Sequence, residues 1–155
     1  MKYVMTQGFA KRRHGCLVVL DPKVPREPKY KESSVDPEHP FKELVLFEYT
    51  WGQETDWEHD YRKVARAKAF ASWKTGLPTR LINQSAPYLY EPGFTKWPGS
   101  AVGPGGLVVA FSGVEDYFDE MFSEIMLAII KGLCMHEVHG PGGVMADSDI
   151  TFLGV

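Results

Sequence analysis

The sequence predicts an α/β protein in which helices pack on a central, mainly antiparallel sheet. Short apolar runs bounded by turn residues alternate with longer segments of helical periodicity, in the order strand, strand, helix, loop, strand, helix. The first two strands follow one another without an intervening helix, so we expect them to pair as an antiparallel hairpin.

Length and composition are those of one ordinary globular domain, which we take as residues 1–155. Hydrophobic residues make up 44% of the chain and charged residues 24%. A net charge of −3 argues against a general nucleic-acid partner. With no apolar leader and no long apolar run, neither a membrane partner nor secretion is indicated, and we expect a cytoplasmic protein.

The first two strands are predicted on either side of a long loop. Cys16 to Leu20 is a continuous apolar run that ends at Asp21-Pro22. Five prolines then fall among many charges in residues 22–40, which marks a proline-rich insertion. The second apolar run, from Leu44 to Thr50, predicts the strand that pairs with the first.

A helix is predicted from about Trp57 to Lys74, with Asp56 as its N-cap and Gly76 as its C-cap. Lys68 lies at the centre of the apolar stripe of this helix. Phe70 and Trp73 lie off the stripe, which suggests that the end of the helix meets another element, such as a second subunit.

The segment from Gly105 to Glu120 predicts a buried strand, Leu107 to Phe111, that turns directly into a second long helix. Ser112 and Glu115 have the spacing of a capping box at the start of that helix. The helix is expected to continue to about Met135. Its stretch from Ile125 to Ile130 is apolar nearly all round, which predicts burial on several sides. A last edge strand is predicted over residues 150–153.

Three segments in this order resemble one known family. They are Ala65 to Ala71 followed by Pro78-Thr79, the Gly/Pro-rich loop before the last central strand, and Ser112-Gly113 with Asp119-Glu120 downstream. Together they resemble the GlcG/HbpS-like haem-binding (haem-degrading) family, which includes the C-terminal domain of PduO-type corrinoid adenosyltransferases. The resemblance implies a profilin-like sandwich, a homo-oligomer, and haem or a related tetrapyrrole as ligand. The chain departs from the family in residues 1–14, which lack its long N-terminal helix, and in the insertion at 22–40.

Lys68 is the first candidate ligand-binding residue. An ammonium on an apolar stripe suits a ligand carboxylate, or a base whose pKa is depressed by burial. The alternative is that it extends to the helix edge or pairs with a carboxylate at the edge of the core.

The neighbouring loops supply the other candidate ligand-binding residues. Thr79 and Arg80 follow the helix C-cap, where they could clamp an anion or simply satisfy turn carbonyls. Phe94 and Trp97 could stack on a flat ligand or pin their loop to the core. Gly99 lies in the same Gly/Pro-rich loop, whose backbone can approach a ligand closely.

Cys134, His136 and His139 form the tightest cluster of soft metal ligands, suited to zinc, copper or haem iron. Their spacing matches no strong zinc signature, and histidines also suit a helix C-terminus. A second cluster of carboxylates at the start of the same helix could bind a hard cation, although a solvated acidic helix start explains it with less: Asp116, Asp119, Glu120 and Glu124.

These residues lead to three functional hypotheses. The first is an oligomeric binding protein for a small molecule, with haem as the candidate cofactor. The second is a metal-dependent or lyase-like enzyme that uses Lys68 and the carboxylates. The third is a non-catalytic assembly module, suggested by fold analogy.

Overall fold

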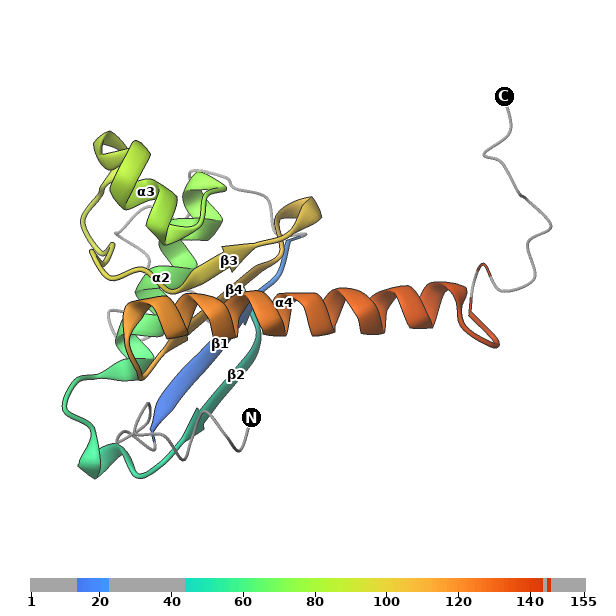
Figure 1. The fold of residues 1–155 in the computed structure, drawn as a ribbon, viewed down its shortest axis with the longest axis horizontal. Helices are drawn as coiled ribbons and strands as arrows, with labels where there is room; N and C mark the ends of the chain where they lie inside the picture. Colours follow the sequence, from blue (N-terminus) through green and yellow to red (C-terminus); the bar gives the residue numbers. More distant parts are fainter. Residues whose placement is uncertain (1–13, 23–43, 144, 146–155) are drawn as a thin grey trace.

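The computed structural model describes residues 14–22, 44–143 and 145 (Figure 1). This part of the chain contains four strands and three α-helices, with short 3-10 turns between some of them. In chain order they are β1 (Gly15–Leu20), β2 (Val45–Trp51), α2 (Tyr61–Thr75), α3 (Thr79–Ser85), β3 (Ser100–Val102), β4 (Val108–Ser112) and α4 (Asp116–His139).

The strands form one open antiparallel sheet in the order β2-β1-β4-β3. In the central strand β1, Val18 lies opposite Glu48 of β2 on one side and Ala110 of β4 on the other. The predicted hairpin between the first two strands is confirmed, as is an α/β fold with helices on an antiparallel sheet.

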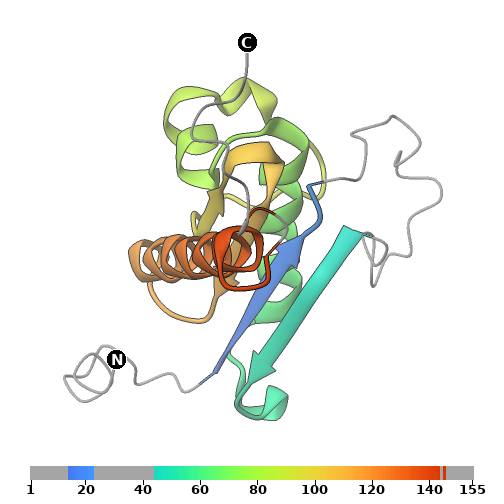
Figure 2. The same ribbon diagram turned by 90° about the vertical axis from the view of Figure 1, so that its right-hand side faces the viewer.

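Helices α2 and α4 cover opposite faces of this sheet (Figures 1 and 2). Alternate residues of β1 explain how one strand serves both layers: Val18 packs under α2, whereas Leu17 and Val19 pack under α4. All six residues of β1 are therefore buried.

The end of α2 meets another element, as predicted, but that element belongs to the same chain. Phe70 and Trp73 need no second subunit to cover them, because both are buried in the core that α2 shares with the sheet. Phe94, from the loop ahead of β3, packs edge-on against Phe70 with the ring centroids 5.8 Å apart.

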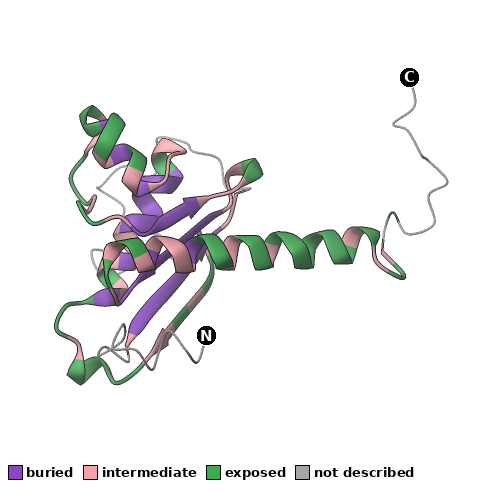
Figure 3. Ribbon diagram, viewed as in Figure 1, coloured by how far each residue is buried: buried purple, intermediate pink, exposed green. Residues whose placement is uncertain are grey.

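The second half of α4 differs from the prediction that it is buried on several sides. The helix packs on β4 and β3 through its first half and then extends beyond the sheet (Figures 1 and 3). Ile125 and Ile129 were expected to be buried on several sides, yet both are about half exposed, and Leu133 is 61% exposed. The sequence correctly indicated that the second half of α4 is apolar, but within one chain the sheet is too short to cover this part of the helix.

The start of α2 lies four residues later than predicted. Asp60 is the N-cap, and its Oδ1 accepts a hydrogen bond from the backbone N–H of Lys63 at 2.9 Å. Asp56 belongs to a preceding 3-10 turn. The predicted end is confirmed, because Gly76 has a left-handed φ of 74° and donates its N–H to Ser72.

The predicted capping box at the start of α4 is wrong. Ser112 is the last residue of β4, and Glu115 precedes the helix without a side-chain cap bond. Asp119, one turn inside the helix, reaches back and accepts the backbone N–H of Val114 at 3.1 Å. Because the helix begins only at Asp116, the hydroxyl of Ser112 takes no part in its cap.

Two predictions lie outside the described residues: the proline-rich insertion beyond Pro22 and the edge strand at 150–153. Within the described ranges, no helix combines the length and apolarity needed to cross a lipid bilayer.

Candidate functional site

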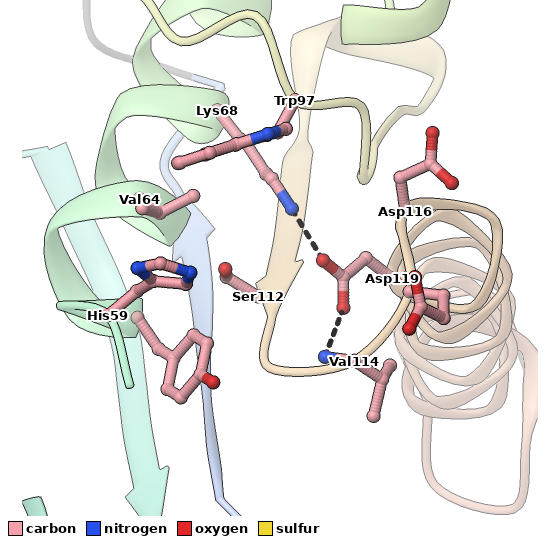
Figure 4. A pocket seen from close by; sticks show the side chains of 10 residues that line it. His59, Val64, Lys68, Trp97, Ser112, Val114, Asp116 and Asp119 are labelled. Atoms are coloured by element: carbon pink, nitrogen blue, oxygen red, sulfur yellow. Dashed lines mark hydrogen bonds and ion pairs between the residues drawn. The ribbon is translucent and has the colours of Figure 1, made fainter. Parts of the chain in front are cut away.

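A cavity of about 250 Å³ lies where the start of α2 faces the junction of β4 and α4 (Figure 4). It is walled by the first two turns of α2 and the turn before them, by the loop ahead of β3, and by the chain that leaves β4 and enters α4. The lining residues from α2 and the loops are His59, Tyr61, Val64, Lys68 and Trp97. Those from the β4–α4 junction are Ser112, Val114, Glu115, Asp116 and Asp119.

A buried ion pair between Lys68 and Asp119 forms one side of the cavity (Figure 4). Lys68 Nζ lies 2.6 Å from Asp119 Oδ2 and donates a second hydrogen bond to the backbone oxygen of Phe111 at 3.0 Å. The two side chains are 1% and 4% exposed. Of the alternatives for Lys68, the structure shows pairing with a buried carboxylate, at the wall of a cavity.

Burial shifts the pKa of both partners. Desolvation raises the pKa of Asp119 from 3.8 to about 6, while the attraction of Lys68 acts in the opposite direction. Desolvation likewise lowers the pKa of Lys68 from 10.5, against the attraction of Asp119. The two pKa values are thus brought toward each other, a pattern that recurs at acid–base sites and also in structural ion pairs.

The hydroxyl of Ser112 points into the cavity from the end of β4 (Figure 4). Ser112 is only 4% exposed, and its hydroxyl forms no hydrogen bond to any described residue. The oxygen is not fully enclosed, so a water molecule or a ligand in the cavity can bond to it. Its position therefore suggests a ligand or a water molecule in the cavity.

Behind the ion pair, buried hydroxyl groups fix the loop that carries Gly99. Ser100 Oγ is hydrogen-bonded to Ser72 Oγ at 2.7 Å and to Thr79 Oγ1 at 2.8 Å. Gly99 in turn donates its N–H to Thr79 Oγ1 and accepts the hydroxyl of Ser123. Thr79 is thus a buried structural residue that does not line the cavity.

Because Gly99 has no side chain, it leaves room for the ion pair of Lys68 and Asp119. A Cβ at this position would lie 2.6 Å from both Lys68 Nζ and the Cβ of Asp119, and its φ of 135° is one that other residues rarely adopt. The predicted close approach of this backbone is real, but the group it approaches is the ion pair.

The remaining predicted ligand-binding residues lie in three different places. Trp97 lines the cavity, with its ring centroid 5.8 Å from that of His59. Phe94 packs against Phe70 in the core. Arg80 is bonded to Glu120 on α4 and lies outside the cavity lining.

The predicted soft-ligand cluster lies at the far end of α4. The helix extends through His139, so His136 and His139 do lie on one helix, and Cys134 is exposed. Among the described residues, however, no group of three or more histidine, cysteine, aspartate or glutamate side chains is placed to hold a metal ion.

Sequence reasoning missed the roles of Ser112 and Asp119. Ser112 had a sufficient explanation as a helix cap, and Asp119 had one as part of an acidic helix start. His59 was passed over because it has no partner nearby in the sequence. The one available signal was Lys68, because a buried ammonium requires a carboxylate from somewhere in the fold.

No protein-family profile, curated protein or solved structure matches this chain. The cavity and its residues are therefore the basis for a functional proposal.

Proposed function

We propose that this protein binds a small molecule in the cavity between α2 and the β4–α4 junction. The observation that carries the proposal is the Ser112 hydroxyl, which is buried, faces the cavity and lacks a described partner. Beside it, the Lys68 ammonium has three N–H groups, of which two are used by Phe111 and Asp119. The cavity thus offers two donors to a ligand oxygen.

The volume of the cavity favours a compound smaller than a tetrapyrrole. At about 250 Å³ it lies just below the range of roughly 300–1,000 Å³ in which drug-sized ligands are enclosed. Haem or a corrinoid, as the GlcG/HbpS-like resemblance implies, would have to rest on the rim rather than inside. An antiparallel sheet with a helix on each face is compatible with the profilin-like sandwich of that family.

A thermal-shift screen tests the proposal, because selective binding to the folded state raises its apparent stability. The panel contains haemin, cobalamin and small metabolites of varied charge. Val64→Phe, which fills the cavity from α2, should abolish any shift, whereas Val138→Phe on the projecting part of α4 should leave it unchanged. A shift that survives Val64→Phe would move the binding site elsewhere, and a saturable Soret change with haemin that Val64→Phe leaves intact would favour a rim-bound tetrapyrrole.

A lyase-like enzyme that uses the Lys68 amine is the second candidate function. It is favoured by the lowered pKa of Lys68, since an amine must lose its proton before it can attack a carbonyl carbon. In that reaction the amine and a carbonyl compound form an imine with loss of water, and borohydride reduces the imine to a stable secondary amine.

Mass spectrometry of borohydride-treated protein tests this second candidate. Incubation with pyruvate should give an adduct on Lys68 that is absent from Lys68→Arg. An adduct spread over exposed lysines, or none above background, would refute the amine chemistry.

We further propose that a second copy of the chain covers the projecting part of α4. Ile125, Ile129 and Leu133 are spaced by four residues and form one exposed apolar stripe. The helix starts with acidic residues and ends with His136 and His139. An antiparallel pair of α4 helices would place each acidic start against a histidine-bearing end, which is why a second copy suits the surface.

Sedimentation equilibrium tests this arrangement. The protein should be a dimer or a higher oligomer that Ile129→Glu dissociates. Leu81→Glu is the matched control, because Leu81 on α3 is also exposed but lies off the stripe. A monomeric parent protein would indicate that α4 is covered by other segments of the same chain or by a different partner.

A further inference from the structure

The cavity has an excess of negative charge. The only cation among the described residues that line it, Lys68, is neutralised by Asp119 at 2.6 Å. Two further carboxylates line the cavity, Glu115 and Asp116. Asp116 has the guanidinium of Arg80 at 3.9 Å, but Arg80 is bonded more closely to Glu120.

An anionic ligand is therefore disfavoured, even though a lysine lines the site. A carboxylate placed near Lys68 would also lie near Asp119, and it would face Glu115 and Asp116 across the opening. Like charges repel and opposite charges attract across the partly closed site, although water and salt weaken the effect at Glu115, which is exposed, and at Asp116, whose side chain is 44% exposed. A cation gains from the same carboxylates.

One wall of the cavity is aromatic. The rings of Trp97 and His59 lie 5.8 Å apart at 34° to one another, and Tyr61 meets His59 edge-on. Trp97 is 43% exposed, so a ligand can reach its ring. An accessible indole beside carboxylates is typical of sites that bind flat or methylated cations, because the ring face attracts positive charge.

The inner end of the cavity is a pair of hydrogen-bond donors. The Ser112 hydroxyl and the third N–H of Lys68 both suit an acceptor oxygen, such as that of a carbonyl or an amide. The volume holds roughly eight water molecules, at ~30 Å³ each, which corresponds to a compound of about ten non-hydrogen atoms.

We propose that the cavity binds a small, flat nitrogen cation that carries a carbonyl or amide oxygen. The oxygen would bond to Ser112 and Lys68, the ring would lie along Trp97, and the positive charge would face Glu115 and Asp116. This ligand class rests on the proposed binding function and narrows it. The simplest compound of the class is a pyridinium carboxamide.

A charge series built on one ring tests the ligand class. The probes are 1-methylnicotinamide, nicotinamide and nicotinate, which carry a positive, zero and negative charge at nearly equal size. In calorimetric or NMR titrations at low salt, the cation should bind at least about tenfold more tightly than the anion, with nicotinamide between them. The preference should shrink at higher ionic strength, because screening weakens the carboxylate contribution.

Three variants assign the contacts. The double variant Glu115→Gln with Asp116→Asn should weaken the cation about tenfold and leave nicotinamide unchanged. Glu124→Gln, an exposed carboxylate of α4 outside the cavity lining, is the matched control and should change neither. Ser112→Ala should weaken both amides to the same extent, because it removes a donor to their shared oxygen.

The possible failures are distinguishable. If nicotinate binds as tightly as the cation, or if the double variant leaves the cation unaffected, the ligand class is wrong while the binding function stands. If no member of the series binds saturably up to about 10 mM, a weak limit for compounds of this size, the ligand class is overturned. The binding function is overturned with it only if the thermal-shift panel also yields no ligand whose shift Val64→Phe abolishes.

Discussion

Removal of the Lys68 ammonium is the perturbation that most directly tests the site. Lys68→Met keeps most of the apolar stem of the side chain but leaves the carboxyl of Asp119 buried without its partner cation. Both side chains of the pair are almost inaccessible, with Nζ and Oδ2 2.6 Å apart. Loss of one partner of a buried pair costs about 3–5 kcal/mol, because the other charge remains uncompensated.

The same substitution six residues later on α2 provides the control. Lys74 pairs with Glu91, and both side chains are more than 40% exposed. Lys74→Met should therefore reduce the free energy of unfolding by less than about 1 kcal/mol. In thermal unfolding, Lys68→Met should lower Tm by about 10 °C, and Lys74→Met by no more than about 3 °C.

The cost of Lys68→Met should depend on pH in a known direction. Burial raises the pKa of Asp119 above its unfolded value of 3.8, to about 6, so its contribution to stability is fully present below pH 4 and is lost as the pH rises through 6. Without Lys68 the pKa of Asp119 rises further. At pH 5 the carboxyl of the variant is therefore protonated, and most of the loss seen at pH 7.5 should disappear.

Urea denaturation at pH 5 and pH 7.5 measures this, with Lys68→Met combined with Asp119→Asn as a second check. The asparagine has no charge and its oxygen can still accept the N–H of Val114, so the double variant should recover most of the stability at pH 7.5. The reasoning is refuted if Lys68→Met costs no more than Lys74→Met, or if its cost is the same at both pH values.

Two further predictions concern the packing around the site. Gly99→Ala should destabilise the protein by about 2 kcal/mol or more, because its Cβ would lie 2.6 Å from Lys68 Nζ at a φ of 135°. Gly132→Ala, which has open space around it on α4, should instead stabilise the protein by up to about 1 kcal/mol. Equal effects of the two variants in urea denaturation would contradict this prediction. In a Cys134→Ser background, Cys16 should not react with Ellman's reagent at pH 8 until urea unfolds the chain, because burial raises the pKa of its thiol to about 12; rapid labelling of the folded protein would show that β1 opens.

Three of the four strands were predictable because their signals are local, whereas β3 lies within the predicted Gly/Pro-rich loop. The runs around Val18, Leu46 and Val109 are apolar, short and bounded by turn residues, and each became a strand. The start of α2 was less predictable, because either Asp56 or Asp60 is able to act as its N-cap. Packing in three dimensions selected Asp60, which the sequence pattern does not encode.

The candidate site was predictable only from its one local anomaly. Lys68 stands out because an ammonium interrupts an apolar stripe. Its partner Asp119 lies 51 residues away, among other acidic residues whose presence the helix dipole already explains. No pattern within a single helix or strand predicts a contact between residues 51 positions apart. The pair is identified only from the positions of α2 and α4 on the sheet.

The start of α4 at Asp116 explains why Ser112 was misread. A serine before a helix normally caps it, and that role would have used the hydroxyl. Asp119 accepts the N–H of Val114, in the turn before α4, with one oxygen and holds Lys68 with the other. The same carboxylate neutralises Lys68, the only cation among the described residues that line the cavity. The cavity is therefore left with two hydrogen-bond donors and an acidic rim that Arg80 offsets only in part, at Asp116, which is the combination that selects a cation with an acceptor oxygen.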